Sequence, residues 1–430
     1  MRKVLLPLLV GSLLAGWTGP VSANPIGTDT ETTVSVSDGI EVRQVRLYDP
    51  LPDSVGSHPA ACDSIDYLRY RFSDGPDDPQ RADTVLLAQP AAFMGAFSLD
   101  QIARNSLNQL RSKGTRGEWW SLPQRSGCAF DNTGLASGDA TQAFDYYFDG
   151  GVVDGKRFDG FRPGTFLADI GLRQMAHDEY TVLTRQLPSA RFRSERVFCG
   201  GHADGALATA AFAAWDFEGT PGYSLCAGFF GLDGLINTDW LGLGANPLFQ
   251  KVTSLVGSRG YLAAVQQMRN GVLPTIFAGM PAIGSEAITL LPIAGLNSTQ
   301  LPLFKVSMEN VDLHTLAGQL SSVSGVLGYV NPYYTTRFFL DLLGAFGGDR
   351  APDADFGFLK YEAEVRNQPR LTVIGTASMQ MDLYPKLGLL PADTVYIPGY
   401  THQDVVAGTS DTDPVGAALT DFVTARLEAK

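Results

Sequence analysis

Residues 195–215 constrain the fold more than any other part of this sequence. An apolar run at residues 197–201 ends in glycine, and an alanine-rich stretch follows it. Between the two stands Gly201-His202-Ala203-Asp204-Gly205, in which two glycines frame a small residue. Short apolar runs of this length are typical of buried strands, and glycines at such a junction allow close backbone approach. The segment therefore predicts a buried strand, a tight turn and a packed helix.

The same rhythm of strands and helices extends along most of the chain. Apolar runs alternate with stretches of helical spacing, which is typical of a parallel sheet covered on both faces. We expect an α/β fold, with a mostly parallel sheet flanked by helices. The expected strands are residues 84–88, 118–122, 197–201, 225–232, 371–374 and 394–397, and the expected helices are residues 99–110, 169–187, 204–215 and 415–427.

Residues 235–368 interrupt this rhythm. They are rich in leucine, glycine and aromatic residues and show mostly helical spacing, and a structureless loop of this size is implausible in a compact domain. We expect a helical cap inserted between two parts of one core, although ordinary extra helices on the sheet would give the same spacing. The expected organisation is a signal peptide at 1–23, core at 24–234, cap or lid at 235–368, and core again at 369–430.

The first residues have the pattern of an export signal. Arg2 and Lys3 precede an apolar stretch at 4–17, and a small-x-small motif ends at Ala23. We therefore expect cleavage near Ala23 and a secreted or periplasmic protein with no transmembrane segment. The formal net charge of −13 argues against nucleic acid as a partner, because nucleic acids are bound by clustered cations. The oligomeric state stays open.

Exported proteins commonly contain disulfides, so the four cysteines are candidates for pairing. Cys62 and Cys128 lie in loop-like sequence and are candidates for a disulfide, whereas Cys199 and Cys226 lie in apolar runs and are expected to be buried thiols. The five histidines are scattered and no zinc-type spacing exists, so we expect no metal and no cofactor. Three Asp-Gly steps at 149, 154 and 159 lack calcium-loop ligand order and are interpreted as turns.

Two motifs together resemble the α/β-hydrolase superfamily, nearest to capped esterases and lipases. One is the Gly201–Gly205 frame, which resembles a nucleophile elbow of the G-x-S-x-G type with Ala203 at the serine position. The other, from Gly399 to Val406, resembles the histidine loop of acid-lipase-type enzymes. The resemblance covers the chain from about residue 84 to its end. Nucleophile, acid and histidine follow one another in this order in that superfamily.

The resemblance implies roles for particular residues. His402 matches the general base, and two carboxylates remain open as the acid that orients it: Asp233, preferred, at the end of the strand before the cap, and Asp382 as the alternative. The position that commonly holds the acid, three residues after Gly375, is Ser378. Asp404 is expected to orient the histidine loop.

The oxyanion hole implied by this resemblance needs two backbone amides. One would come from Asp204 and the other from the loop after the first strong strand, where Ala91 and Ala92 are candidates. Asp204 fits poorly as a nucleophile itself, because centring the elbow on it puts His202 where a small residue is needed. Alanine has no group with which to attack a carbonyl.

Three interpretations of Ala203 follow from the resemblance. The first is a secreted serine-hydrolase scaffold for carboxylic esters with apolar groups, in which Ala203 replaces the serine and leaves the chain inactive or severely impaired. The second is a natural pseudoenzyme that binds an apolar ligand or a protein partner under its cap. The third is catalysis without a covalent intermediate, with His402 and an acid relaying protons. Apolar lining would come from aromatic residues of the cap, unless these form the cap's own core; they are Tyr333, Tyr334, Phe338, Phe339 and Phe346.

Overall fold

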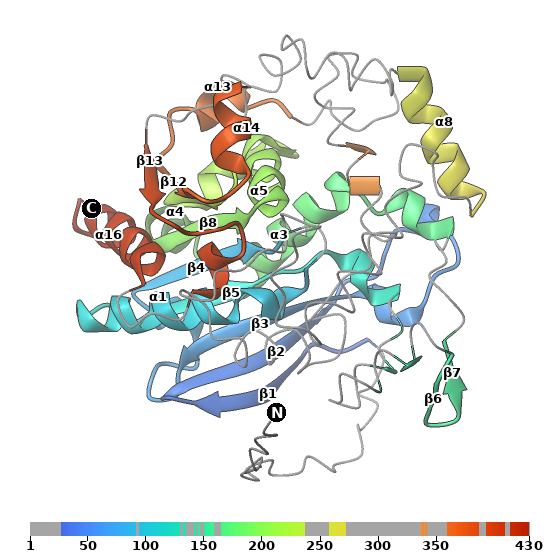
Figure 1. The fold of residues 1–430 in the computed structure, drawn as a ribbon, viewed down its shortest axis with the longest axis horizontal. Helices are drawn as coiled ribbons and strands as arrows, with labels where there is room; N and C mark the ends of the chain where they lie inside the picture. Colours follow the sequence, from blue (N-terminus) through green and yellow to red (C-terminus); the bar gives the residue numbers. More distant parts are fainter. Residues whose placement is uncertain are drawn as a thin grey trace, which may run out of the picture.

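A computed structural model describes most of the chain (Figure 1). No helix within it is long and apolar enough to cross a membrane. The signal-like segment and most of the expected cap lie outside the described part. The described residues are 27–91, 94–129, 131, 133–134, 142, 145–146, 150–158, 165–236, 258–271, 337–338, 340–341, 359–386, 393–408 and 413–429.

A nine-stranded sheet forms the centre of the described structure (Figure 1), with the order β1-β2-β3-β5-β4-β8-β11-β12-β13. The ladders from β5 through β13 are parallel, and those joining β1, β2, β3 and β5 are antiparallel. The strands are β1 (Thr30–Ser37), β2 (Ile40–Tyr48), β3 (Ser64–Phe72), β4 (Thr84–Gln89), β5 (Gly117–Ser121), β8 (Val197–His202), β11 (Gly228–Leu232), β12 (Arg370–Gly375) and β13 (Thr394–Ile397).

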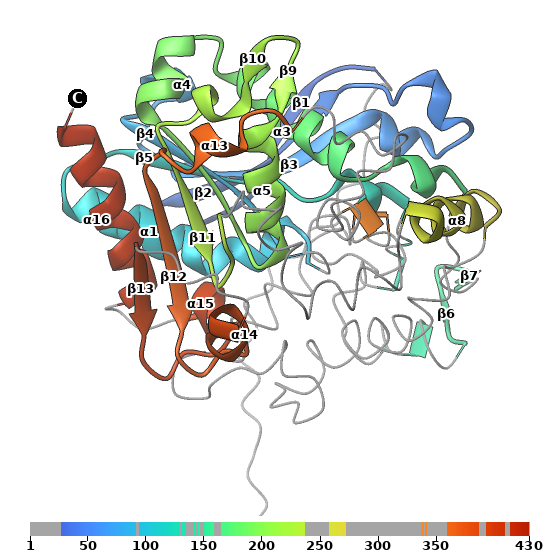
Figure 2. The same ribbon diagram turned by 90° about the horizontal axis from the view of Figure 1, so that it is seen from above.

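Helices cover both faces of this sheet (Figure 2). Alternate residues of β4 face opposite cores, with Val85 in one cluster and Leu86 in the other. The apolar stripes of α3 and α5 pack into the first core, and those of α1 and α16 into the second. The helices are α1 (Asp100–Ser112), α3 (Leu172–Gln186), α4 (Ala190–Arg196), α5 (Asp204–Ala214), α8 (Ser258–Arg269), α13 (Glu362–Val365), α14 (Gln380–Lys386), α15 (Asp404–Ala407) and α16 (Pro414–Glu428).

The structure confirms the predicted fold class and the strands and helices predicted from residue 84 onward, with ends shifted by up to three residues. The strand at 394–397 has the predicted limits, and the strand at 225–232 begins later, at Gly228. The reason is that residues 222–225 form a 3₁₀ turn, so the apolar run contains a connection as well as a strand. Apolar composition alone does not separate the two.

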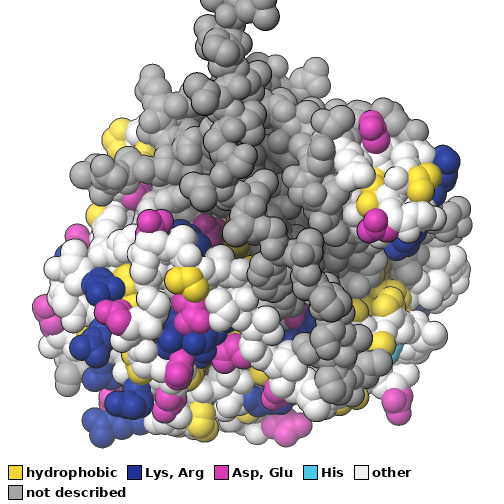
Figure 3. Space-filling model, turned by 90° about the horizontal axis from the view of Figure 1, so that it is seen from below, with side chains coloured by type: hydrophobic (Ala, Val, Ile, Leu, Met, Phe, Trp, Pro, Cys, Tyr) yellow, Lys and Arg dark blue, Asp and Glu magenta, His cyan; other side chains and the backbone are white. Residues whose placement is uncertain are grey.

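Three antiparallel strands before residue 84 were not predicted. β1 lies at the edge of the sheet and consists mainly of exposed polar residues, so it lacks the apolar run used to locate buried strands. Arginines on these strands form ion pairs, including Arg69 with Glu118 of β5 at 2.6 Å and Arg71 with Glu41 of β2 at 3.0 Å. Seen from below, basic and acidic side chains are interspersed on the surface (Figure 3).

Both pairs of cysteines form disulfides. Cys62–Cys128 is the pair that the sequence favoured. The expectation that Cys199 and Cys226 are buried thiols is wrong, because they are bonded to each other. The physical reason is the later start of β11: Cys226 lies outside the parallel ladder, in the connection before Gly228, and its Cα atom is 6.0 Å from that of Cys199.

Loss of the Cys199–Cys226 bond should lower stability substantially. The bond closes a sequence separation of 27 residues, for which chain entropy gives about 3.5 kcal/mol. We expect the free energy of unfolding of the double variant Cys199→Ser/Cys226→Ser, measured by urea denaturation, to be lower by this amount. Addition of a reductant to the parent breaks both disulfides and should lower the free energy of unfolding at least as much. An unchanged midpoint would contradict the contribution assigned to this bond.

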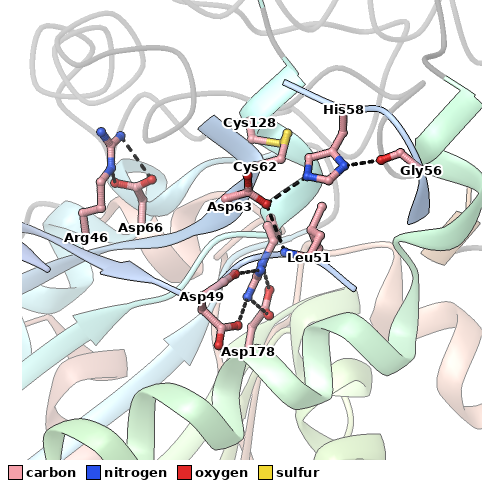
Figure 4. The surroundings of a disulfide bond; sticks show 11 residues. Arg46, Asp49, Leu51, Gly56, His58, Cys62, Asp63, Asp66, Cys128 and Asp178 are labelled. Atoms are coloured by element: carbon pink, nitrogen blue, oxygen red, sulfur yellow. Dashed lines mark hydrogen bonds and ion pairs between the residues drawn. A yellow bond between two sulfur atoms is a disulfide. The ribbon is translucent and has the colours of Figure 1, made fainter. Parts of the chain in front are cut away.

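The Cys62–Cys128 disulfide lies in a polar cluster that holds α3 (Figure 4). Arg125 donates hydrogen bonds to Asp178 on α3, with Nη2 2.5 Å from Oδ1, and to Asp49, with Nη2 2.6 Å from Oδ2. Asp63, next to Cys62, accepts from the Leu51 amide at 3.1 Å. The cluster fixes the middle of α3 relative to the N-terminal strands.

His58 belongs to the same cluster and has acceptors on both ring nitrogens (Figure 4). Nε2 lies 2.9 Å from Asp63 Oδ1 and Nδ1 lies 2.6 Å from the Gly56 carbonyl. A carboxylate and a carbonyl accept only, so both contacts are satisfied when the imidazole carries two protons. The hydrogen bond to Asp63 accordingly raises the pKa of His58 above its usual value.

The raised pKa of His58 predicts pH-dependent stability. A raised pKa stabilises the folded state fully below the unfolded pKa of about 6.5, and this contribution is lost as the pH rises through the folded pKa. His58→Gln should therefore lower Tm by about 1–3 °C at pH 5.5 and by less at pH 8.5. Differential scanning calorimetry of parent and variant measures this difference. An equal effect at both pH values would count against the protonated form.

Part of the expected cap interval is described and contacts the core. Asp341 accepts from the Leu172 amide at the start of α3 at 2.8 Å, and Tyr261 of α8 donates to Asp341 at 2.7 Å. Arg337 also donates to Asp341, at 2.7 Å. Of the cap aromatics, Phe338 is buried in the core cluster that includes α3 and α5, while Tyr333, Tyr334, Phe339 and Phe346 lie outside the described residues. The described part of the interval is thus fastened to the N-terminal end of α3.

The Asp-Gly step at Asp154 is a turn, as predicted. It joins the short strands β6 (Val152–Val153) and β7 (Lys156–Arg157), which pair in antiparallel register. Asp154 and Gly155 have φ values of 50° and 75°, the left-handed conformations that a two-residue hairpin turn requires. Asp149 and Asp159 lie outside the described residues.

Candidate active site

A strained turn at Ala203 joins β8 to α5. Ala203 has φ 51° and ψ −117°, a conformation that L-residues rarely adopt and that costs about 1–3 kcal/mol. Its two glycine neighbours permit this geometry: a Cβ on Gly201 would lie 2.3 Å from the Gly205 carbonyl carbon, and a Cβ on Gly205 would lie 2.3 Å from the Gln89 carbonyl oxygen. The turn is therefore an elbow of the expected shape, with alanine at its apex.

Asp233 and His402 meet beside this elbow. His402 Nδ1 lies 2.5 Å from Asp233 Oδ2, and both side chains are buried. An ionised carboxylate only accepts, so Nδ1 carries a proton and Nε2 is the nitrogen available for chemistry. Asp233 follows β11 directly and has φ 44°, so two of the five non-glycine residues with positive φ in the described part, Ala203 and Asp233, belong to this site.

Two further groups hold the Asp233 carboxylate. The Gly375 amide donates to Oδ1 at 3.1 Å, and the Ser378 hydroxyl donates to Oδ2, the oxygen that also faces His402. Ser378 occupies the position where the resemblance places a catalytic acid, and here it hydrogen-bonds to the acid on the neighbouring strand. The sequence marked this position, but not its contact with Asp233.

Asp382, the alternative acid, lies elsewhere. It is exposed on α14, and its backbone amide donates to the Met379 carbonyl at 3.2 Å. Of the two carboxylates that the sequence left open, the structure brings Asp233 to His402. Asp404 accepts from the Thr401 amide at 2.9 Å and so closes the turn that carries His402.

His202 packs His402 against the elbow. The two imidazole rings stack with centroids 4.4 Å apart, and His202 Nε2 donates to the His402 carbonyl at 3.1 Å. Burial and the neighbouring His402 lower the pKa of His202 well below its usual value, so it remains neutral. No sequence pattern predicts this contact, which joins two residues 200 positions apart in the chain.

The candidate oxyanion donors are only partly described. Asp204 begins α5, and the carbonyls of Gln89 and Pro90 lie against the α-carbon of Gly205, which brings the loop after β4 to the first turn of α5. Ala91 accepts from the Met94 amide at 2.9 Å. Ala92 lies outside the described residues.

Asp204 also contributes a carboxyl group beside the elbow. Loss of hydration in this crowded position raises the pKa of Asp204 to about 6, and the nearby His402 opposes this shift. The elbow residue itself remains Ala203, since the strained turn is centred on it and not on Asp204. Within the described residues, no group of three or more histidine, cysteine, aspartate or glutamate side chains is arranged to hold a metal ion.

The strand order, the elbow and the Asp233–His402 pair are those of an α/β-hydrolase fold. Neither a protein-family model nor a curated protein matches the chain. Among solved structures, it is similar to the peroxisomal α/β-hydrolase Lpx1 from Saccharomyces cerevisiae, with 13% identity, a TM-score of 0.42, and 92% of this chain and 91% of that chain covered.

Two other solved structures show a similar degree of likeness. The α/β-hydrolase GrgF from Penicillium sp. sh18 has 11% identity and a TM-score of 0.38, with 93% of this chain and 99% of that chain covered. The acetyl xylan esterase from Paenibacillus sp. R4 has 12% identity and a TM-score of 0.35, with 93% and 88% covered.

Proposed function

We propose that this chain is a secreted scaffold for hydrolysis of carboxylic esters with an apolar part, in which Ala203 stands at the position of the nucleophilic serine. The observation that carries this proposal is the buried Asp233–His402 pair, with Nδ1 2.5 Å from Oδ2, beside the strained elbow. An Asp–His pair oriented in this way is what a serine hydrolase needs to deprotonate its nucleophile.

With a serine at position 203, the proposed steps follow the triad chemistry. His402 Nε2 takes the hydroxyl proton as the serine oxygen attacks the ester carbonyl, and Asp233 stabilises the imidazolium. The Asp204 amide and an amide of the loop at Ala91 and Ala92 stabilise the oxyanion. His402 then protonates the leaving alcohol, and water releases the acid by the same route. With Ala203 the first attack cannot occur, so the chain as it stands is expected to be inactive or severely impaired.

The proposed location and substrate have separate support. Four cysteines paired as two disulfides fit an oxidising compartment, in agreement with the export signal in the sequence. An apolar substrate is proposed from the composition of residues 235–368. Restoration of the hydroxyl by Ala203→Ser, assayed with p-nitrophenyl esters of varied chain length, tests the proposed activity.

A binding protein is the second candidate, and Ala203 itself favours it. The chain keeps a strained elbow and a buried Asp–His pair around a residue that cannot attack a carbonyl. Such a site would hold an apolar ligand or a protein partner without turning it over. Binding of a fluorescent fatty acid by the parent, with no catalysis after serine is restored, would favour this function.

A further inference from the structure

Glu179 is a fully buried carboxyl group that none of the steps above uses. It lies on α3 with 0% exposure. Gln89 Nε2 donates to its Oε2 at 2.5 Å, while Oε1 has no hydrogen-bond partner in the described structure. No ion pair of Glu179 occurs among the described residues. A buried carboxyl with half of its acceptor capacity unused is costly to keep in a core.

A second buried carboxyl group lies next to Glu179 on the same helix and, unlike Glu179, has a charged partner. Asp178 is also buried, but Arg125 contacts both of its oxygens, at 2.5 and 3.0 Å. Glu179 points to β4 instead, and its one hydrogen-bond partner among the described residues is the neutral Gln89. Burial therefore raises the pKa of Glu179 to about 8, and the side chain is mostly uncharged at neutral pH.

Gln89, the partner of Glu179, lies where β4 ends beside the elbow. Gln89 is the last residue of β4 and pairs with Gly201 of β8, directly before the elbow. Its carbonyl oxygen lies against the α-carbon of Gly205, so Gln89 contacts the elbow through its backbone and α3 through its side chain. The loop that carries Ala91 leaves from this residue.

We propose that Glu179 is a positioning residue, whose hydrogen bond to Gln89 fixes the end of β4 and thereby sets the loop carrying the second oxyanion donor against the elbow. The consequence for catalysis rests on the proposed hydrolase function, whereas the consequence for the backbone does not. The uncharged carboxyl is the form that fits this buried site. Ionisation at alkaline pH draws water toward Glu179 and loosens the strand end. Arg125 begins the 3₁₀ turn at residues 125–129 and pairs with Asp178 and Asp49, so it does not neutralise Glu179.

The catalytic consequence is tested in the Ala203→Ser protein. Glu179→Gln keeps an uncharged acceptor for Gln89, and Glu179→Leu removes it while staying apolar. We expect Glu179→Leu to lower kcat about 10-fold or more with little change in KM, because the oxyanion contact acts mainly in the transition state. If ionisation of Glu179 loosens the strand end, kcat of the Ala203→Ser protein should fall above pH 8. Glu179→Gln should keep kcat within about 2-fold and abolish this fall. The matched control is Glu195→Gln, a surface carboxylate that pairs with Arg191.

Two results would overturn this role. One is a Glu179→Leu protein with unchanged kcat and pH profile, and the other is a Glu179→Gln protein that loses as much kcat as Glu179→Leu. If the Ala203→Ser protein shows no turnover with any ester, the proposed function has failed, and the positioning role is decided by a second measurement on the chain with Ala203.

That second measurement is amide hydrogen exchange in residues 84–91. We expect Glu179→Leu to speed exchange of these amides, and of Leu122, whose amide donates to the Ala88 carbonyl at 2.9 Å, by about 10-fold, the effect of one lost hydrogen bond. Glu179→Gln and Glu195→Gln should exchange like the parent. Parent-like exchange in Glu179→Leu would overturn the positioning role whatever the activity of the serine variant.

Discussion

Ala203→Ser should convert the chain from an inactive protein into an ester hydrolase, with a gain in kcat of about 10⁴- to 10⁶-fold. The gain is this large because His402 and Asp233, the proposed base and acid, are already paired, and the backbone at residue 203 already has the strained geometry of an elbow. The measurement is stopped-flow release of p-nitrophenol from esters of two to twelve carbons, with the parent chain beside it.

The control for this gain is the histidine. In the Ala203→Ser protein, His402→Ala should return the rate close to that of the parent, because the serine hydroxyl is a weak nucleophile without its base. A burst of p-nitrophenol that persists without His402 would show that the serine reacts by another route. No turnover with any ester would contradict the proposed function and leave ligand binding as the better account of the site.

Asp233→Asn in the Ala203→Ser protein should lower kcat by about 10⁴-fold. The asparagine amide presents a donor to His402 Nδ1, which favours the wrong tautomer and leaves the imidazolium without a counter-charge. Asp233 is buried and accepts hydrogen bonds from Gly375, Ser378 and His402. Solvent therefore cannot readily stabilise the imidazolium once the carboxylate charge is lost.

Two further variants serve as comparisons for the loss of kcat in Asp233→Asn. Ser378→Ala removes one charge-assisted hydrogen bond to the carboxylate and should cost about 10-fold in kcat. Asp382→Asn changes the exposed carboxylate on α14 and should leave kcat unchanged. A larger loss in Asp382→Asn than in Asp233→Asn would reverse the assignment of the acid.

The parallel core could be predicted because its strands are apolar and its helices are amphipathic. Residues 84–88 and 197–201 are buried on both faces, so their composition identifies them as central strands. The elbow was equally visible, because close backbone contacts at Gly201 and Gly205 leave glycine as the residue that fits. β1 gave no comparable signal, since an exposed edge strand is polar.

The Cys199–Cys226 disulfide shows why local sequence patterns do not predict contacts between separate segments of the chain. Both cysteines lie in apolar sequence that resembles strand interior, yet Cys226 lies in a connection where it can reach the neighbouring strand. The same limit applies to Glu179. A glutamate on a helix is usually solvent-exposed, and its burial depends on the packing of α3 against β4.

By itself, the sequence predicted the mostly parallel α/β core, the position of the elbow, and His402 as the candidate base, because each rests on patterns within short segments of the chain. Only the tertiary structure showed that Asp233 contacts His402, that Ser378 hydrogen-bonds to Asp233, and that His202 stacks on His402. These contacts join the ends of β8, β11 and β12 to the histidine loop, and their distances depend on the register of parallel strands that are far apart in sequence.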